Sequence, residues 1–557
     1  MNKYRRKFLK SLALLLLFLP IRIFPSFNKE SVISFKYGVA SGDPTNTNVI
    51  LWTKILPIGN PEIRVRWEVS SSKDFLNLIT YGHVRTNSKK DYSVKVDAKI
   101  PKKFNGKKIY YRFLADGKTS DIGMTSTLPS ENPNNFNIAF CSCSNYPAGY
   151  FNAYKEIAKN KKIDLVLHLG DYLYEYGHGG YASKDAEQMG RVVNPKHEMV
   201  SLNDYRKRYA TYRSDPDLKL LHQKKPVISV WDDHEFTNDS WQKGAQNHSK
   251  DEGTFANRKN NALQAYYEWM PIREKVRKDK IWRNFRVGNL LNLMMLDTRS
   301  YERDRQLDIE KYFSGNSFNK NSYLKDLNKP RKLLGKEQFN WIRTKVDNSF
   351  KWSIFGQQIL IGPKYLPKIF QAVDKENFPK FLHKYLSLAG TEIPYNTDQW
   401  DGYPKEREKF YKAIRNSQSN LILAGDSHNS WLSNLFDKNN NFVGIEIGAP
   451  SITSPNFVDT FGEFTDSLDK SFVDSNKDLI WTNGKNKGYV ELNIFSEYVD
   501  VKFNFVSSVK SKNYKNLKPI TFKVNHSEAI TYIKFLYSFC KLLSFHTMYN
   551  CFPKLDR

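Results

Sequence analysis

Short, almost uninterrupted apolar runs recur through this 557-residue chain and limit its possible folds more than any other feature. The run Asp164–Leu169 reads DLVLHL. Such a run is typical of a strand whose two faces are both buried, as happens when helices cover a sheet. Similar runs lie at 137–140, 227–231, 290–296, 352–355, 421–424 and 442–447, with helical stretches at 149–159, 260–270 and 405–414. The pattern predicts an α/β domain over residues 136–524, with one or two packed sheets.

The residues before this domain show a different pattern. Between 35 and 128, apolar and polar residues alternate, as in Val65, Trp67 and Val69. Alternation is typical of half-buried strands, so residues 35–128 are predicted to form an N-terminal β-sandwich domain. The polar stretch 302–335 is predicted to be a surface insertion, and one role considered for this insertion is that of a lid. Residues 525–557 change character again and form a C-terminal extension to which no role is assigned.

The first residues, 1–28, resemble an export signal. Basic residues precede the apolar run Leu12–Leu19, which is shorter than the roughly 20 residues of a membrane span. Arg5-Arg6 and the following Lys-Phe-Leu-Lys resemble a twin-arginine signal, although Tyr4 and the lack of an A-x-A cleavage site depart from it. The expectation is export by the twin-arginine machinery to the periplasm, cell surface or medium. The alternative is a basic amphipathic start without a targeting role.

The composition is that of a basic, globular protein. Charged residues make up 26% and apolar residues 40%, which excludes wholesale disorder and coiled coil. Lys and Arg number 86 against 58 Asp and Glu, a net charge of +28. This charge favours phosphate-bearing substrates or an anionic lipid surface, although a Lys-rich composition explains it equally well. The basic and aromatic stretch 205–213 is interpreted as a packed helix, so no specific nucleic-acid partner is expected.

Polar residues follow the predicted buried strands, at the points where the strands end. Cys143, Asp171, Asp233 and the pair Asp426 and His428 all stand in such positions. Open α/β sheets bind ligands at the carboxyl ends of their strands. One aspartate after a strand is often a helix cap, but converging carboxylates, imidazoles and a thiol need a cation to neutralise them. A two-metal site also needs a shared carboxylate, and Asp171 is the candidate because Gly170 lets the chain turn before it.

The motifs together resemble a known family. The series GD, DDHE and GDSH is similar to the metallophosphoesterase signature, and the blocks FCSCSNYPAGYFNAY, LHLGDYLYEYG, VWDDHEFTND and DQWDGYPKERE resemble the PhoD-type alkaline phosphatases. The resemblance implies a four-layer αββα metallophosphoesterase domain with two packed mixed sheets, preceded by a fibronectin-like β-sandwich domain. It implies hydrolysis of phosphate mono- or diesters by a metal-activated hydroxide. The alternative within the family is a phospholipase D-like phosphodiesterase that acts on phospholipids.

The resemblance also implies the metals and their ligands. It places ferric iron (Fe3+) between Cys143, Asp171, Tyr174 and His428, and calcium (Ca2+) between Asp171, Asp233 and Asp426. A phenolate ligand requires a strong Lewis acid, and calcium prefers oxygen, so the residue types agree with these metals.

Three further residues are implied to act on the substrate. His234 follows Asp233 as the superfamily's catalytic histidine follows its asparagine, and is expected to protonate the leaving oxygen or to stabilise charge. Asn238 and Arg258 are expected to bind phosphate oxygens, the alternative for Arg258 being a solvated residue near a helix start. The superfamily has one more metal-binding histidine, and the sequence only weakly indicates Gln357 as the residue in its place. Arg299 is interpreted as structural.

Overall fold

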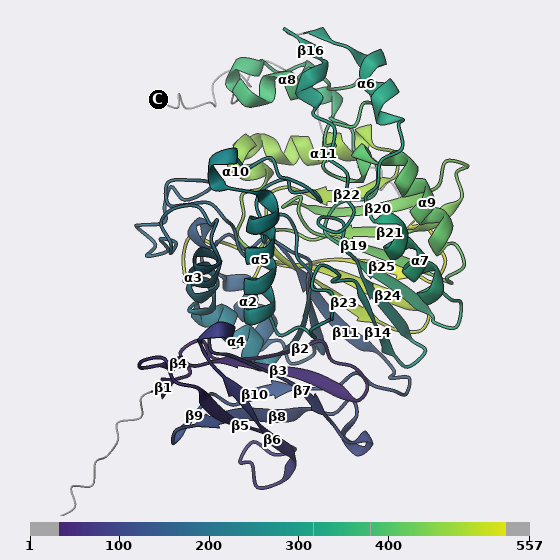
Figure 1. Ribbon diagram of the computed structural model, residues 1–557. Helices are drawn as coiled ribbons and strands as arrows, with labels where there is room; N and C mark the ends of the chain where they lie inside the picture. Colours follow the sequence, from purple (N-terminus) through teal and green to yellow (C-terminus); the bar gives the residue numbers. More distant parts are fainter. Residues whose placement is uncertain (1–32, 316, 379, 531–557) are drawn as a thin grey trace, which may run out of the picture.

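The computed structural model describes residues 33–315, 317–378 and 380–530 (Figure 1). The predicted signal segment 1–28, the cysteines Cys540 and Cys551, and most of the extension 525–557 lie outside these residues. Within the described ranges, we find no helix with both the length and the hydropathy that crossing a bilayer requires.

The larger sheet carries the first half of the predicted buried strands. In the described ranges its order is β25-β24-β23-β11-β12-β13-β2-β3-β7. Its strands are β2 (Val39–Gly42), β3 (Asn48–Lys54), β7 (Ser93–Lys99), β11 (Phe136–Cys141), β12 (Leu165–His168), β13 (Pro226–Ser229), β23 (Lys487–Ile494), β24 (Tyr498–Val506) and β25 (Ile520–Asn525). Strands β11, β12 and β13 are parallel, so the residues that follow them emerge at one edge.

The second sheet carries the other predicted strands, in the order β14-β15-β18-β19-β21-β20-β22. Its strands are β14 (Arg283–Val287), β15 (Leu291–Met295), β18 (Trp352–Gly356), β19 (Asn420–Ala424), β20 (Ser430–Phe436), β21 (Phe442–Gly448) and β22 (Leu479–Asn483). Strands β15, β18, β19 and β21 are parallel, and each lies within a residue or two of a predicted apolar run. Both sheets contain parallel and antiparallel pairs and are therefore mixed.

The two sheets share one hydrophobic core, and helices pack on each of them. Ile138 of β11 and Leu423 of β19 belong to the same buried cluster, together with Tyr209 and Leu263 from the helices. Those helices are α2 (Asn152–Lys159), α3 (Leu202–Arg213), α4 (Pro216–Lys224) and α5 (Phe255–Trp269). Helices α7 (Gly335–Lys345) and α9 (Pro404–Ile414) join a separate cluster with β15, β18 and β19, and Figure 1 shows them on the other side of the molecule from α3.

The N-terminal strands form a sandwich that is built into the larger sheet. Strands β5 (Ile63–Ser70), β6 (Leu78–Thr86), β8 (Ile109–Ala115), β9 (Lys118–Thr119) and β10 (Gly123–Thr125) make a five-stranded sheet, and β1 (Ile33–Ser34) pairs with β4 (Leu56–Pro57). The core of the sandwich lies between this sheet and β2, β3 and β7. Because β2 pairs in parallel with β13, the N-terminal region shares a sheet with the following domain.

A helical cap lies over one end of the molecule, at the top of Figure 1. It is built from η5 (Ile309–Tyr312), β16 (Phe313–Ser314), β17 (Ser317–Phe318), α6 (Lys320–Leu327), η6 (Lys368–Gln371), η8 (Lys380–Leu382) and α8 (His383–Leu386). The cap shares a hydrophobic cluster with α11 (Thr465–Ser475) and with partly buried side chains of α10 (Phe457–Phe461) and η10 (Gly462–Phe464). The predicted insertion 302–335 is its first half.

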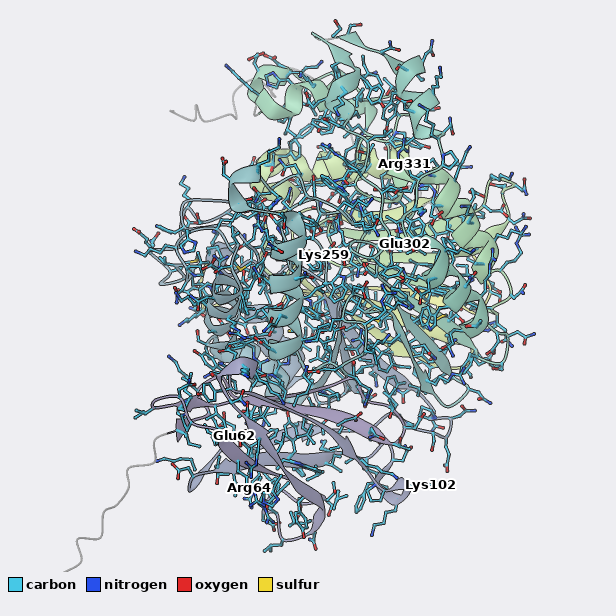
Figure 2. All side chains as sticks on the ribbon, viewed as in Figure 1. Glu62, Arg64, Lys102, Lys259, Glu302 and Arg331 are labelled. Carbon is cyan, nitrogen blue, oxygen red and sulfur yellow. The ribbon has the colours of Figure 1, made fainter. Side chains whose placement is uncertain are left out.

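Charged side chains lie on both parts of the molecule. Figure 2 labels Glu62, Arg64 and Lys102 in the N-terminal region, and Lys259, Glu302 and Arg331 in the rest of the molecule.

Candidate metal centre

The carboxyl ends of the strands meet at a pocket of about 990 Å3. Most of the predicted site residues line it: Asp171, Asp233, His234, Asn238, Asp426 and His428. Cys143 and Tyr174 are buried directly behind this wall. The structure thus brings together eight residues that are spread over nearly 300 positions of the sequence.

Four of these residues have an unusual backbone conformation. Cys143, Asp171, Asp426 and His428 all have φ between 53° and 62°, in the left-handed region. This conformation costs free energy for a residue with a Cβ, and it is concentrated at functional sites. Gly170 makes the turn before Asp171 possible, since its φ is 109° and an added Cβ would lie 2.4 Å from the Cβ of Asp232. All four residues belong to the candidate metal-binding groups described next.

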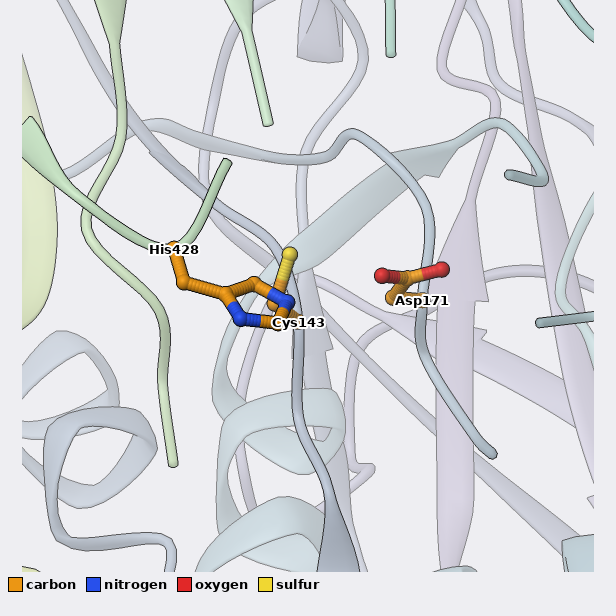
Figure 3. Close-up of side chains that lie close together, drawn as sticks. All are labelled: Cys143, Asp171 and His428. Atoms are coloured by element: carbon orange, nitrogen blue, oxygen red, sulfur yellow. The ribbon is translucent and has the colours of Figure 1, made fainter. Parts of the chain in front are cut away.

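The first donor group consists of Cys143, Asp171 and His428, whose ligand atoms lie within 4.8 Å of one another (Figure 3). Tyr174 joins them. Its hydroxyl donates to Asp171 Oδ2 at 3.0 Å, lies 3.2 Å from His428 Nε2, and accepts from Ser454 Oγ at 2.7 Å. His428 Nδ1 donates to the carbonyl of Pro455 at 2.7 Å, which leaves Nε2 free to act as a ligand.

The thiol and the phenol of this first group stay protonated unless a cation is bound beside them. Burial, followed by the nearby Asp171, raises the pKa of the Cys143 thiol and of the Tyr174 phenol well above their ordinary values. Burial lowers the pKa of His428 to about 4, so this imidazole is neutral at pH 7. One thiol, one phenol, one carboxylate and one neutral imidazole are a donor set that fits ferric iron.

The second donor group consists of four aspartates and His234. Asp171, Asp233 and His234 come together, as do Asp232, Asp233 and Asp426. Among the described residues, the buried atoms Asp171 Oδ1, Asp232 Oδ2 and Asp233 Oδ1 have no hydrogen-bond partner. A buried carboxylate oxygen without a partner is costly, and a hard cation removes that cost. These oxygens fit calcium, and Asp171 belongs to both donor groups.

Arg299 places a positive charge among these acids. Its fully buried guanidinium contacts Asp232, lies 2.5 Å from Asp398 Oδ2, and donates to Asp426 Oδ1 at 2.9 Å. Burial raises the pKa of Asp233, but Arg299 and His234 outweigh it and hold that pKa at about 2. Asp398 lines the pocket, yet it stood in the motif DQWDGYPKERE without a predicted role. The acidic cluster therefore includes two residues, Asp232 and Asp398, for which the sequence predicted no role.

Glu175 holds the candidate catalytic histidine. His234 Nδ1 donates to Glu175 Oε2 at 2.6 Å, so Nε2 remains available. Burial lowers the pKa of His234, but the charges of Glu175, Asp233 and Asp171 outweigh burial and raise it well above its ordinary value. The other oxygen of Glu175 accepts from the backbone N–H of Asn238 at 2.8 Å. One buried carboxylate therefore positions two of the predicted substrate residues.

Glu235 similarly holds in place the loops that follow β12 and β13. Its carboxylate accepts from the backbone N–H groups of Asp171 at 3.0 Å, Tyr172 at 2.6 Å and Asp232 at 2.6 Å. It therefore ties the loop after β12 to the loop after β13. Neither Glu175 nor Glu235 was predicted to act, although both lie in the motifs that carry the resemblance.

Two residues that the sequence suggested for the site do not line the pocket. The guanidinium of Arg258 is buried at the side of α5, where it donates to Glu198 at 2.6 Å and to Glu252 at 3.1 Å. With these ion pairs Arg258 is not among the residues that line the pocket, and its burial contradicts the alternative of a solvated residue. Gln357 accepts from Trp400 Nε1 at 2.9 Å and does not line the pocket either. A position after a strand or near a helix start does not reveal which way the side chain turns.

Comparisons with known proteins give the same assignment as the motifs. The family model for PhoD-like phosphatase matches residues 138–503, and the model for the PhoD-like phosphatase N-terminal domain matches residues 25–129. Alkaline phosphatase D from Bacillus subtilis (strain 168) is 37% identical over 440 residues, which are 75% of this chain and 69% of that protein. The solved structure of PhoD superposes with a TM-score of 0.74 at 31% identity, covering 89% of this chain and 92% of that one.

The matches confirm the resemblance that the motifs indicated. All of these names are those of phosphatases, so the comparisons favour that activity over the phospholipase D-like alternative. The chain belongs to the PhoD-like phosphatase family and is a phosphoric ester hydrolase.

Proposed function

We propose that the chain hydrolyses phosphate mono- and diesters at an iron–calcium site. The observation that carries this proposal is the position of Asp171. Its carboxylate belongs both to the donor group that contains Cys143 and to the donor group that contains Asp233. Cys143, Asp171, Tyr174 and His428 would hold Fe3+, and Asp171, Asp233 and Asp426 would hold Ca2+. Asp232 lies in the same acidic group and would assist on the calcium side.

The chain's own residues would orient the ester and move the proton. The metals, when bound, supply Lewis acidity to the phosphate and an activated water to attack it. Glu175 and the aspartates raise the pKa of His234, which favours its protonated form, and its Nε2 is available to protonate the leaving oxygen. Asn238 lines the pocket and is positioned through its backbone by Glu175, so its amide is the remaining candidate for a phosphate oxygen. Arg258 is not part of this proposal.

The finer description of the fold is also proposed. The shared core of the two mixed sheets, with helices packed on each, supports a four-layer αββα arrangement. The core between the five-stranded sheet and β2, β3 and β7 supports a fibronectin-like sandwich at the N-terminus.

Removal of calcium tests the proposed activity. A purified preparation is expected to lose hydrolysis of a soluble phosphate ester after exhaustive chelation and to regain it when Ca2+ is added, because Asp233 and Asp426 offer only oxygen atoms. Hydrolysis should be followed together with calcium content. Full activity in a sample shown to contain no calcium would contradict the proposal.

Export by the twin-arginine route is the proposal for localisation. The supporting feature is the sequence from Arg5 to Lys10, and the net charge of +28 supports an anionic lipid surface as a further partner. The double variant Arg5→Lys, Arg6→Lys should block export while the protein still folds, because lysine lacks the planar guanidinium. Cell fractionation with an activity assay measures both properties. Unchanged export of the double variant would indicate another route.

A further inference from the structure

The pocket that contains the acidic cluster is also lined by apolar side chains. They include Leu307, Leu382, Tyr385, Tyr395, Phe457 and Phe461, and each of these side chains keeps part of its surface exposed. Phe370 and Trp431 line the same pocket and are almost completely buried. One pocket is thus lined by carboxylates and histidines and by aliphatic and aromatic side chains.

The first apolar wall is attached directly to the metal centre. Ser454 and Pro455 hold Tyr174 and His428, as described above. Two residues later Phe457 begins α10, and its backbone N–H donates to Asn429 Oδ1 at 3.0 Å. The aromatic wall therefore continues the segment that fixes two candidate iron ligands.

The second apolar wall, at Leu307, starts at the acidic cluster as well. Arg303 Nη2 donates to Asp398 Oδ1 at 2.5 Å, and Leu307 follows four residues later. The carbonyl of Leu307 accepts from Thr397 Oγ1 at 2.5 Å, next to Asp398 in the sequence. Both apolar walls are therefore fixed in position relative to the place where a phosphate would bind.

An apolar surface inside a substrate pocket has a consequence for the substrate. An ester with only small polar groups would leave these rings and aliphatic chains in contact with water. An apolar group would cover them, with a gain proportional to the area removed from water. Resting on the proposed function, we propose that the natural substrate is a phosphate ester that carries an apolar alkyl or aryl group. Leu307, Phe457 and Phe461 form the subsite for that group.

A homologous series of substrates tests this subsite. The methyl, butyl and octyl diesters of 4-nitrophenyl phosphate share one leaving group, so the chemical step stays constant while the apolar group grows. For the metal-loaded full chain, kcat/KM is expected to rise about two- to fourfold for each methylene that the pocket buries. Equal kcat/KM for the three esters would overturn the subsite and leave the proposed function standing. No turnover of any ester by metal-loaded protein would instead overturn the proposed function.

Two variants and a matched control locate the subsite. Phe461→Ser should lower kcat/KM for the octyl ester about tenfold and change that for the methyl ester less than about twofold. Leu307→Ser gives the same test at the second apolar wall if the first variant folds poorly. The control is Phe464→Ser: the Phe464 ring lies 6.1 Å from that of Phe370, against 5.6 Å for Phe461, but Phe464 does not line the pocket. An equal loss in Phe464→Ser would overturn the assignment.

Vesicles distinguish two sources of the apolar group. Turnover of a phosphatidyl ester in anionic vesicles, with the same loss in Phe461→Ser, would identify a lipid. Turnover of the soluble octyl ester alone would identify a soluble alkyl or aryl ester.

Discussion

Asp171→Asn is expected to reduce phosphate ester hydrolysis at least about a thousandfold, because metal ions supply several kcal/mol of transition-state stabilisation and each 1.36 kcal/mol is tenfold in rate. Asp171 is the carboxylate common to both donor groups, so its loss affects both proposed metals. Asparagine tolerates the left-handed φ of 53° at this position, so the turn after Gly170 is kept. Steady-state kinetics together with metal analysis would measure the loss.

The same variant should stabilise the metal-free protein. Burial and the neighbouring acids raise the pKa of Asp171 well above its ordinary value. A carboxyl group whose pKa is raised by folding costs stability as the pH rises above its unfolded value of about 3.9. Asparagine has no charge, so at pH 7 the metal-free variant should melt above the metal-free parent. With metals bound, the order should reverse, since binding stabilises the parent by mass action.

A matched control separates this effect from a general loss of charge. Asp185 is paired with Lys510 at 2.7 Å on the surface, and such pairs contribute little. Asp185→Asn should leave both activity and melting temperature close to those of the parent. Substantial metal-dependent activity in Asp171→Asn would show that this carboxylate does not bridge the site.

Tyr174→Phe is expected to remove most of the visible absorption of the iron-loaded protein. A phenolate bound to Fe3+ transfers charge to the metal and absorbs visible light, and Tyr174 is the phenol that contacts both Asp171 and His428. Cys143, Asp171 and His428 remain in the variant, so part of the iron and the fold should be retained. Much of the activity should be lost. A spectrum normalised to measured iron content tests this prediction.

Tyr172→Phe is the control for that spectrum. Tyr172 is also buried and lies two residues before Tyr174 in the sequence. Its hydroxyl, however, lies 2.9 Å from His222 Nε2, which is not one of the candidate iron ligands. The band should therefore persist in Tyr172→Phe. If iron-loaded Tyr174→Phe kept the parent spectrum, Tyr174 would be a packing residue and the ferric assignment would be wrong.

The convergence of most site residues could be predicted from the sequence, and so could seven parallel strands: β11, β12, β13, β15, β18, β19 and β21. Antiparallel strands such as β20, β23 and β24 were not predicted. Buried strands such as β12 and β19 are recognisable because they are apolar on both faces. The polar residues directly after them must then appear at one edge of a parallel sheet. Asp171, Asp233 and His428 were therefore placed by local pattern and topology together, with the family resemblance assigning their roles.

Other features depend on partners that are distant in the sequence. Alternation predicted half-buried strands between residues 35 and 128, but it could not show that β2 pairs with β13. Arg258 had a suitable residue type for phosphate, yet Glu198 and Glu252 hold it elsewhere. The roles of Glu175 and Glu235 consist of contacts with other loops, so their positions within motifs gave no direct indication of them.

The most direct test of the account is the metal content of the purified full-length protein, measured by elemental analysis alongside its visible spectrum and its activity. The account predicts iron in proportion to protein, calcium in the same preparation, and a visible band that follows the iron content. A fully active and colourless preparation that contains neither iron nor calcium would contradict it.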